Sequence, residues 1–256
     1  ALAERFELLI SIFSKGERPS GSSDPFALRR AGNGILQIIW DRNWEFDLNH
    51  LLDDFINYWT TLFPEFSIKH SILSKELRQF FRQRIISLLE EDGIDVDLVN
   101  SLTGGLDSTS YLLSNPSDVK LRSSVLHKMR SDNTLSSLQL VVTRASRLAK
   151  NSQLPLSIIS PEGIIDQKLF EKDSEFQLLN IINALEPITK SNSRDRYFEL
   201  AKVLIDGSKA LAEFFDGDQS VMVMTDDLKI RNNRLNLLAI IRNQARVLAD
   251  FDYISA

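Results

Sequence analysis

Apolar residues recur at the spacing of an α-helix along nearly the whole chain. Phe80-Phe81, Ile85 and Leu88-Leu89 form one such stripe, which arginines and other polar residues interrupt. The clearest strand-like alternation, at 221–224, is short, and we expect its Met222 and Met224 to be buried by packing. With 10 Gly and 7 Pro, turns are too sparse for a many-stranded sandwich. The pattern predicts an all-α helical bundle.

Capping residues divide this pattern into separate helices. Asp24-Pro25 is typical of an N-cap followed by proline at the first helical position, and it predicts a helix through about Asn43. Asp226-Asp227 suits the start of the last helix, because acids stabilise the N-terminal end of the helix dipole. A joint is expected near Leu62–Pro64, and a loop over 151–165. Further helices are expected at the first residues and near 47–62, 74–92, 118–130, 133–150, 172–190, 194–214 and 226–250.

The composition excludes several classes of site. Hydrophobic residues at 43% and charged residues at 25% of 256 are typical of a globular protein. The absence of cysteine excludes disulfides, zinc fingers, iron–sulfur clusters and thiol catalysis, and the 3 histidines disfavour a multi-histidine metal centre. The first residues resemble the interior of a helix, so we expect a fragment of a longer polypeptide. No apolar run reaches the roughly 18 residues of a membrane span, and the composition fits a cytoplasmic protein.

Charge is distributed unevenly along the chain. The formal net charge is −5, which by itself argues against a uniformly basic nucleic-acid-binding protein. Divided by position, residues 1–68 carry −4, residues 69–150 carry +3 and residues 151–256 carry −4. Within the middle segment, 120–150 holds seven basic residues and one acid. This block is a candidate footprint for a polyanion, and a solvated helix face is the alternative.

One segment is similar to a phosphate-binding loop. Thr103–Ser108 reads T-G-G-L-D-S and resembles the SGGxDS loop of ATP pyrophosphatases, whose consecutive glycines let backbone N–H groups surround pyrophosphate. That loop requires a buried strand immediately before it. The preceding residues have apolar positions at 94, 98, 99 and 102, which predict instead an amphipathic helix ending at Gly104.

Two longer segments resemble one family. Residues 15–31 read K-G-E-R-P-S-G-S-S-D-P-F-A-L-R-R-A, which is similar to the G-x-x-P-[TS]-G-x-x-D-P-F-A-L-R-R-A segment of the bacterial glycyl-tRNA synthetase β subunit. Near the other end, F-F-D at 214–216, V-M-V-M at 221–224 and R-N-N-R-L-N-L-L at 231–238 resemble that family's closing motif. The family's A-D-K-L-D is replaced here by A-E-R-F-E at 3–7, which argues against a metal-dependent phosphohydrolase role. Compared with that family's pattern, residues 104–116 resemble an insertion.

The resemblance implies a tRNA-binding, C-terminal fragment of that subunit. Residues 1–66 would be the C-terminal part of an HD-like helical domain, and 67–256 a helical region with a DALR-type anticodon-binding domain, its core at about 117–256. The resemblance further implies an α₂β₂ heterotetramer in which the α subunit attaches glycine to its tRNA using ATP and Mg. We therefore expect glycine tRNA and the α subunit as partners, and neither catalytic residues, metal nor cofactor in this fragment.

Proteins recognise an anticodon by contacts of Lys and Arg side chains with its phosphates, and by stacking on and hydrogen bonding to its splayed bases. Arg144, Arg147 and Lys150 are spaced so that they share one face of a helix. Asn233 adds a donor beside Asn232 for the edges of bases. Two alternatives remain: an ATP-pyrophosphatase-type enzyme built on Thr103–Ser108, and a structural helical scaffold that docks protein subunits. The predicted tRNA-binding residues are Lys120, Arg122, Lys128, Arg130, Arg144, Arg147, Lys150, Arg231, Asn232 and Arg234.

Overall fold

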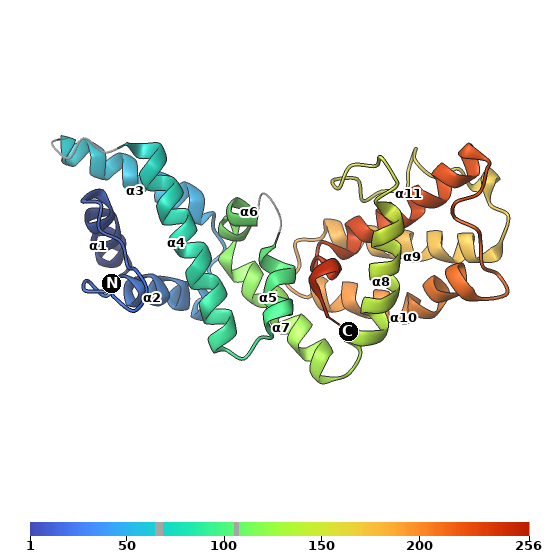
Figure 1. Ribbon diagram of the computed structural model, residues 1–256, viewed down its shortest axis with the longest axis horizontal. Helices are drawn as coiled ribbons and strands as arrows, with labels where there is room; N and C mark the ends of the chain where they lie inside the picture. The colour runs from blue at the N-terminus through green and yellow to red at the C-terminus, as the bar shows by residue number, and fades with distance from the viewer. Residues whose placement is uncertain (65–68, 105–107, 256) are drawn as a thin grey trace. The chain divides into compact units, whose positions relative to one another are not determined.

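A computed structural model describes residues 1–64, 69–104 and 108–255. Over these residues the chain is helical, with an isolated bridge between Ser20 and Ser23 and no strand, as the sequence pattern predicted. The chain divides into two compact units, residues 1–123 and residues 124–256 (Figure 1). The predicted boundary at residue 66 lies inside the first unit, and the predicted core at 117–256 begins close to the second. The extents of the two family domains stay predictions.

The first unit packs phenylalanines into its core. Phe6 is stacked on Phe55 with ring centroids 4.9 Å apart and lies 6.0 Å from Phe81. These rings join α1 to α3 and α4, since each residue lies on one of these helices. The helices of this unit are α1 (Leu2–Ser14), α2 (Leu28–Asp41), α3 (Leu48–Leu62), α4 (His70–Glu91), α5 (Val96–Thr103), α6 (Ser108–Ser114) and the first part of α7 (Pro116–Ser131).

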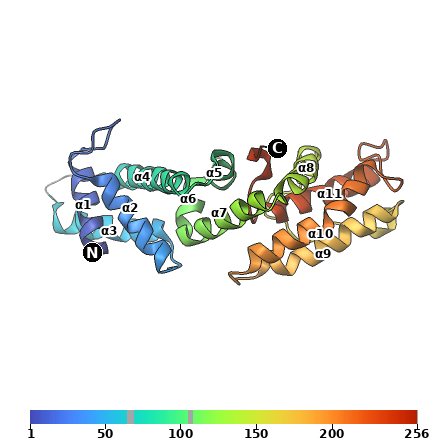
Figure 2. The same ribbon diagram turned by 90° about the horizontal axis from the view of Figure 1, so that it is seen from below.

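The second unit surrounds its last long helix. Helices α9 and α10 run side by side in both views (Figures 1 and 2), and α11 packs against α8 and α9. Between Leu235 and Ala245, α11 is buried at nearly every position, so it forms the middle of this unit. The remaining elements are α8 (Leu135–Ala149), η2 (Gln167–Leu169), α9 (Asp173–Lys190), α10 (Arg196–Asp216), α11 (Leu228–Ala245) and η3 (Phe251–Tyr253).

Buried amides of α11 hold the long loop between α8 and η2. Asn243 Nδ2 donates to the carbonyls of Pro155 at 2.9 Å and Ile158 at 2.7 Å. Asn233 exchanges two hydrogen bonds with the backbone of Asp166, at 2.9 and 3.0 Å. A loop without internal secondary structure needs partners for its buried carbonyls, and these side chains supply them. Asn233 is thereby buried inside the fold and does not offer its amide to RNA.

Replacing Asn243 with Ala is expected to destabilise the second unit by about 1–3 kcal/mol. The substitution removes both hydrogen bonds, together with the two that Asn243 Oδ1 accepts from Arg242. It leaves the carbonyl of Ile158 without this donor, while the carbonyl of Pro155 still accepts from the backbone N–H of Ile158 at 3.1 Å. Urea unfolding measures the loss, and limited proteolysis should show faster cleavage within 151–165. The control is Arg246→Ala, an exposed neighbour whose ion pair with Asp250 contributes about 0–1 kcal/mol. An Asn243→Ala variant as stable as the control would contradict the anchoring role.

The structure confirms most predicted helices and corrects the start of the second one. Helix α2 begins at Leu28, not at Asp24-Pro25, because Ala27 has a left-handed φ of 53°. Asp24 still caps this helix from outside, accepting hydrogen bonds from the backbone N–H groups of Leu28 at 2.8 Å and Arg29 at 3.0 Å. Asp227 caps α11 as predicted, accepting from Lys229 N at 2.8 Å and Ile230 N at 3.1 Å.

The prediction that Met222 and Met224 are buried was wrong. Their exposed fractions are 73% and 48%, while Val223 between them is buried. Segment 221–224 is not a strand, and it follows α10 on the way to α11. All four residues at 221–224 are apolar, so the sequence pattern could not show which of them face solvent.

Candidate nucleic-acid interface

The clearest cationic face lies on α8. Arg144, Arg147 and Lys150 are all exposed, with Lys150 just beyond the last residue of the helix. Leu140, one turn before Arg144, is also 69% exposed. The three cations therefore share one solvent-facing side of α8, as their spacing predicted.

The existing partners of these cations do not prevent them from binding a phosphate. Arg144 pairs with Asp216, and its guanidinium lies 4.5 Å from the centroid of the Phe215 ring. Lys150 lies 3.1 Å from a carboxylate oxygen of Asp252. Ion pairs on an exposed surface contribute about 0–1 kcal/mol, so exchange for a phosphate costs little. Among the described residues, no ion pair or hydrogen bond of the Arg147 side chain is recorded.

The cations of α7 fall into two groups. Lys120 and Arg122 belong to the first unit. Arg122 is buried, with its side chain 3% exposed and its Nε donating to Asp118 at 2.9 Å, and Lys120 pairs with Asp92. In the second unit, Lys128 is exposed, and Arg130 is half-buried and donates to the carbonyl of Ser255 at 3.5 Å.

Of the three predicted tRNA-binding residues on α11, two are accessible to solvent and Arg234 is buried. Asn232 is exposed and Arg231 is half-buried, so both are accessible. The Arg234 side chain is 3% exposed. Its position, like that of Arg122, is incompatible with the predicted contact to tRNA, because neither guanidinium reaches the surface.

Arg234 is the centre of a buried ionic network. Its Nε donates to Glu175 at 2.9 Å, and its Nη2 donates to Glu171 at 2.7 Å. Its Nη1 donates to the carbonyl of Met222 at 3.1 Å, so the network also holds the segment before α11. Burial by itself lowers the pKa of Arg234, but the hydrogen bonds and charges of Glu175 and Glu171 outweigh it and raise that pKa. The guanidinium is therefore charged and serves the fold.

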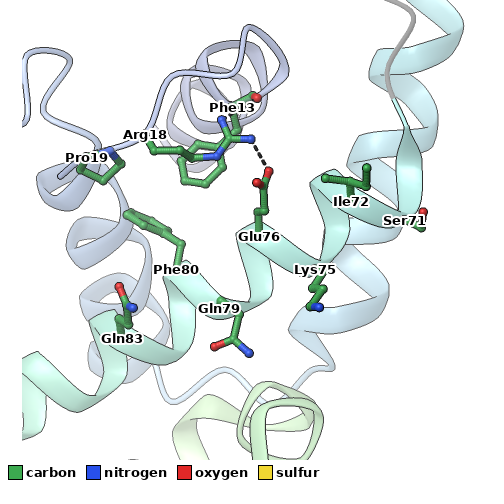
Figure 3. A pocket seen from close by; sticks show the side chains of 10 residues that line it. All are labelled: Phe13, Arg18, Pro19, Ser71, Ile72, Lys75, Glu76, Gln79, Phe80 and Gln83. Atoms are coloured by element: carbon green, nitrogen blue, oxygen red, sulfur yellow. Dashed lines mark hydrogen bonds and ion pairs between the residues drawn. The ribbon is translucent and has the colours of Figure 1, made fainter.

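A hollow lies in the first unit, between the end of α1 and α4 (Figure 3). Its volume is about 700 Å³. The guanidinium carbon of Arg18 lies 4.2 Å from the centroid of the Phe13 ring, and the guanidinium forms an ion pair with Glu76 across the hollow. Lys75 and the side chain of Gln79 lie along α4 at its edge (Figure 3). Because Glu76 neutralises Arg18, this hollow does not favour a polyanion.

The structure overturns the ATP-pyrophosphatase alternative. That alternative requires a strand ending at Leu102, whereas Val96–Thr103 forms helix α5. Gly104 follows the helix with extended backbone angles, φ −75° and ψ 163°, and residues 105–107 lie outside the described residues. Within the described ranges, no group of three or more His, Cys, Asp or Glu side chains could hold a metal ion. No helix there is long and apolar enough to cross a bilayer.

Comparison with known proteins relates both units to one family. A family model described as "Glycyl-tRNA synthetase beta subunit" matches residues 1–104, and one described as "DALR anticodon binding domain" matches residues 138–249. A glycine–tRNA ligase beta subunit of Trichodesmium erythraeum is 40% identical over 99% of this chain, which spans 36% of that relative. Over nearly its whole length the chain is similar to members of the glycyl-tRNA synthetase beta-subunit family.

Other relatives carry the same name. The beta subunit of Picosynechococcus sp. is 41% identical, and that of Levilactobacillus brevis is 28% identical, each over 99% of this chain. The chain spans about a third of the length of these relatives. Helix α8, with its exposed cations, falls largely inside the residues matched by the anticodon-binding model.

Proposed function

We propose that the second unit binds the anticodon region of glycine tRNA. The observation that supports this most directly is the exposed cationic face of α8, within the part of the chain that matches an anticodon-binding domain. Arg144, Arg147 and Lys150 contribute contacts to phosphates, which set the affinity and position the RNA. Lys128, Arg130, Arg231 and Asn232 are further contacts from the same unit. Arg122 and Arg234 stabilise the fold.

The proposal places this chain within a glycine–tRNA ligase of α₂β₂ composition in the cytoplasm. The α subunit performs the ATP- and Mg-dependent attachment of glycine, while this chain holds the tRNA. The names of the relatives support this assignment, since each is called a beta subunit of glycine–tRNA ligase.

We expect the chain to bind glycine tRNA more tightly than the same tRNA with a different anticodon, and to lose affinity as salt rises. The physical reason is counterion release, for which the logarithm of affinity falls by about 0.7–0.9 per logarithmic unit of salt for each phosphate contacted. Fluorescence anisotropy across a salt series, with both tRNAs, measures the slope and the anticodon preference. Absence of binding at roughly 50 mM salt would contradict an independent anticodon-binding unit.

A second candidate function is docking of another protein subunit. Met222, Met224 and Leu228 are 73%, 48% and 59% exposed within a short stretch of the second unit. Exposed apolar residues that occur together mark interaction surfaces more often than isolated ones do. This candidate predicts that changes to the cations of α8 leave tRNA affinity unaltered.

A further inference from the structure

Three large apolar side chains are exposed where the chain passes from α10 to α11. Met222, Met224 and Leu228 form this group, the methionine patch, while Val223 between the methionines is buried. Methionine is unbranched and carries a polarizable thioether, so a surface of this kind adapts to apolar side chains of a partner. The patch therefore offers apolar contact area to another molecule.

The backbone that carries the methionine patch is fixed to the rest of the second unit. The buried Arg234 donates to the carbonyl of Met222 at 3.1 Å, and Ser174 Oγ donates to the carbonyl of Gln219 at 2.6 Å. These hydrogen bonds use backbone carbonyls, so the exposed methionine side chains stay available. A surface on a fixed backbone loses little conformational freedom when a partner binds, which favours docking.

The charges around the methionine patch are mostly negative. Residues 216–227 contain four aspartates, all exposed, and neither lysine nor arginine. The start of α9, which Ser174 joins to this segment, adds the exposed Glu171 and Asp173. Against these acids stand the exposed Lys172 and Lys229, and Arg144 of α8, which pairs with the first of the four aspartates. The surplus of acids repels phosphates and attracts a basic partner.

The backbone of the segment also indicates the form of the partner. Residues 217–227, all of which the structure describes, form turns and no strand. They present no row of backbone N–H and C=O groups with which an extended peptide could pair. A docked segment must therefore satisfy its own backbone hydrogen bonds, as an α-helix does. An amphipathic helix with basic residues beside its apolar face matches both the patch and the acids around it.

We propose that the methionine patch docks a basic amphipathic helix of a partner protein. Apolar side chains of that helix pack on Met222, Met224 and Leu228, and its lysines or arginines pair with Asp218 and Asp226. The inference rests on the docking function given above as the second candidate, and it adds the chemistry of the partner. It does not involve the cationic face of α8.

Binding of a designed peptide tests the apolar contact. The probe is a labelled leucine–lysine peptide of about 18 residues, with its leucines on one helical face, and fluorescence anisotropy measures its affinity for the full chain. Met222→Ser combined with Met224→Ser is expected to weaken binding about 10- to 100-fold, because two apolar contacts are lost. The matched control combines Tyr58→Ser with Leu156→Ser, whose parental side chains are 65% and 53% exposed, and should bind like the parent. Parental affinity in the methionine variant would overturn the proposal.

Removing acids tests the basic character of the partner. Asp218→Asn combined with Asp226→Asn is expected to weaken binding of the same peptide about 3- to 30-fold and to reduce its salt dependence. Glu162→Gln combined with Asp206→Asn removes the same formal charge at exposed acids of the second unit and should have a clearly smaller effect. Equal losses in the two variants would overturn the assignment of the acids. These variants keep every apolar side chain, so they test the proposal even if thermal unfolding shows that the methionine variant is unstable.

The outcomes separate this inference from the function on which it rests. A leucine–glutamate peptide of the same pattern should bind far more weakly than the leucine–lysine peptide. Methionine-dependent binding of the acidic peptide alone would overturn the basic partner and leave the docking function standing. No methionine-dependent binding of either peptide would overturn both. Parental affinity of the methionine variant for glycine tRNA would support a protein-binding surface, whereas a loss of that affinity would overturn it in favour of an RNA contact.

Discussion

Replacing Glu175 with Gln is expected to lower the free energy of unfolding of the second unit by ~3–5 kcal/mol. The Glu175 side chain is 0% exposed and faces an Arg234 side chain that is 3% exposed. One carboxylate oxygen accepts from the backbone N–H groups of Glu171 at 2.7 Å and Lys172 at 3.0 Å, and the other from Arg234 Nε at 2.9 Å. The neutral amide leaves the buried guanidinium with only the carboxylate of the exposed Glu171 as its counter-charge. Urea unfolding measures the change.

The control for this prediction is Glu199→Gln, an exposed acid in the first turn of α10, which should lower stability by at most about 1 kcal/mol through its lost interaction with the helix dipole. A double variant, Glu175→Met with Arg234→Met, should recover part of the loss, because apolar residues of similar size replace a buried pair at little cost. A loss below about 1 kcal/mol in Glu175→Gln would show that water or another group compensates Arg234.

Reversing the charge of Arg144 and Arg147 together is expected to weaken binding to glycine tRNA by about 100-fold or more. Each hydrogen bond to a charged group contributes about 1.5–3 kcal/mol, and glutamate adds repulsion from phosphate. Fluorescence anisotropy at one fixed salt concentration measures the affinity. Because both side chains are exposed on α8, the substitution leaves the core intact. Loss of the Arg144–Asp216 ion pair and the new repulsion should lower stability by only about 0–1 kcal/mol, which thermal unfolding measures.

The matched control reverses two exposed lysines outside the predicted set, Lys168 and Lys209. It alters the net charge equally, so it reproduces the long-range electrostatic effect without touching α8. A clearly smaller loss in the control attributes the effect to the face of α8. Equal losses in the two variants would contradict a specific contact there, and no loss in either would favour the docking function.

The positions of most helices follow from the pattern of residues that are close together in the sequence. Asp47 caps α3 by accepting from Asn49 N at 2.7 Å, and this helix begins and ends within a residue of its predicted range. The helix before Gly104 was likewise predicted from the apolar spacing, which argued against a phosphate loop, and the structure then confirmed the helix. Helix α6 was not predicted, because its seven residues offer too short a periodic pattern.

The predicted contact residues illustrate what such a pattern cannot decide. Arg144 and Arg234 are both arginines on helices with apolar neighbours, yet one is exposed and the other buried. The difference comes from Glu175, which lies 59 positions before Arg234 in the sequence. A cavity of about 200 Å³ lined by Phe198 was also missed, since its walls come from α7 and α10, which are far apart along the chain.

The sequence by itself determined the helical class, most helix positions, the basic block at 120–150 and the two segments that indicate the family. These properties follow from the order of neighbouring residues, because helix periodicity, capping and charge density act over a few positions. The tertiary structure alone decided which cations face solvent and which amides hold the 151–166 loop. Burial and long-range hydrogen bonds depend on contacts between distant residues, and only the folded chain brings those residues together.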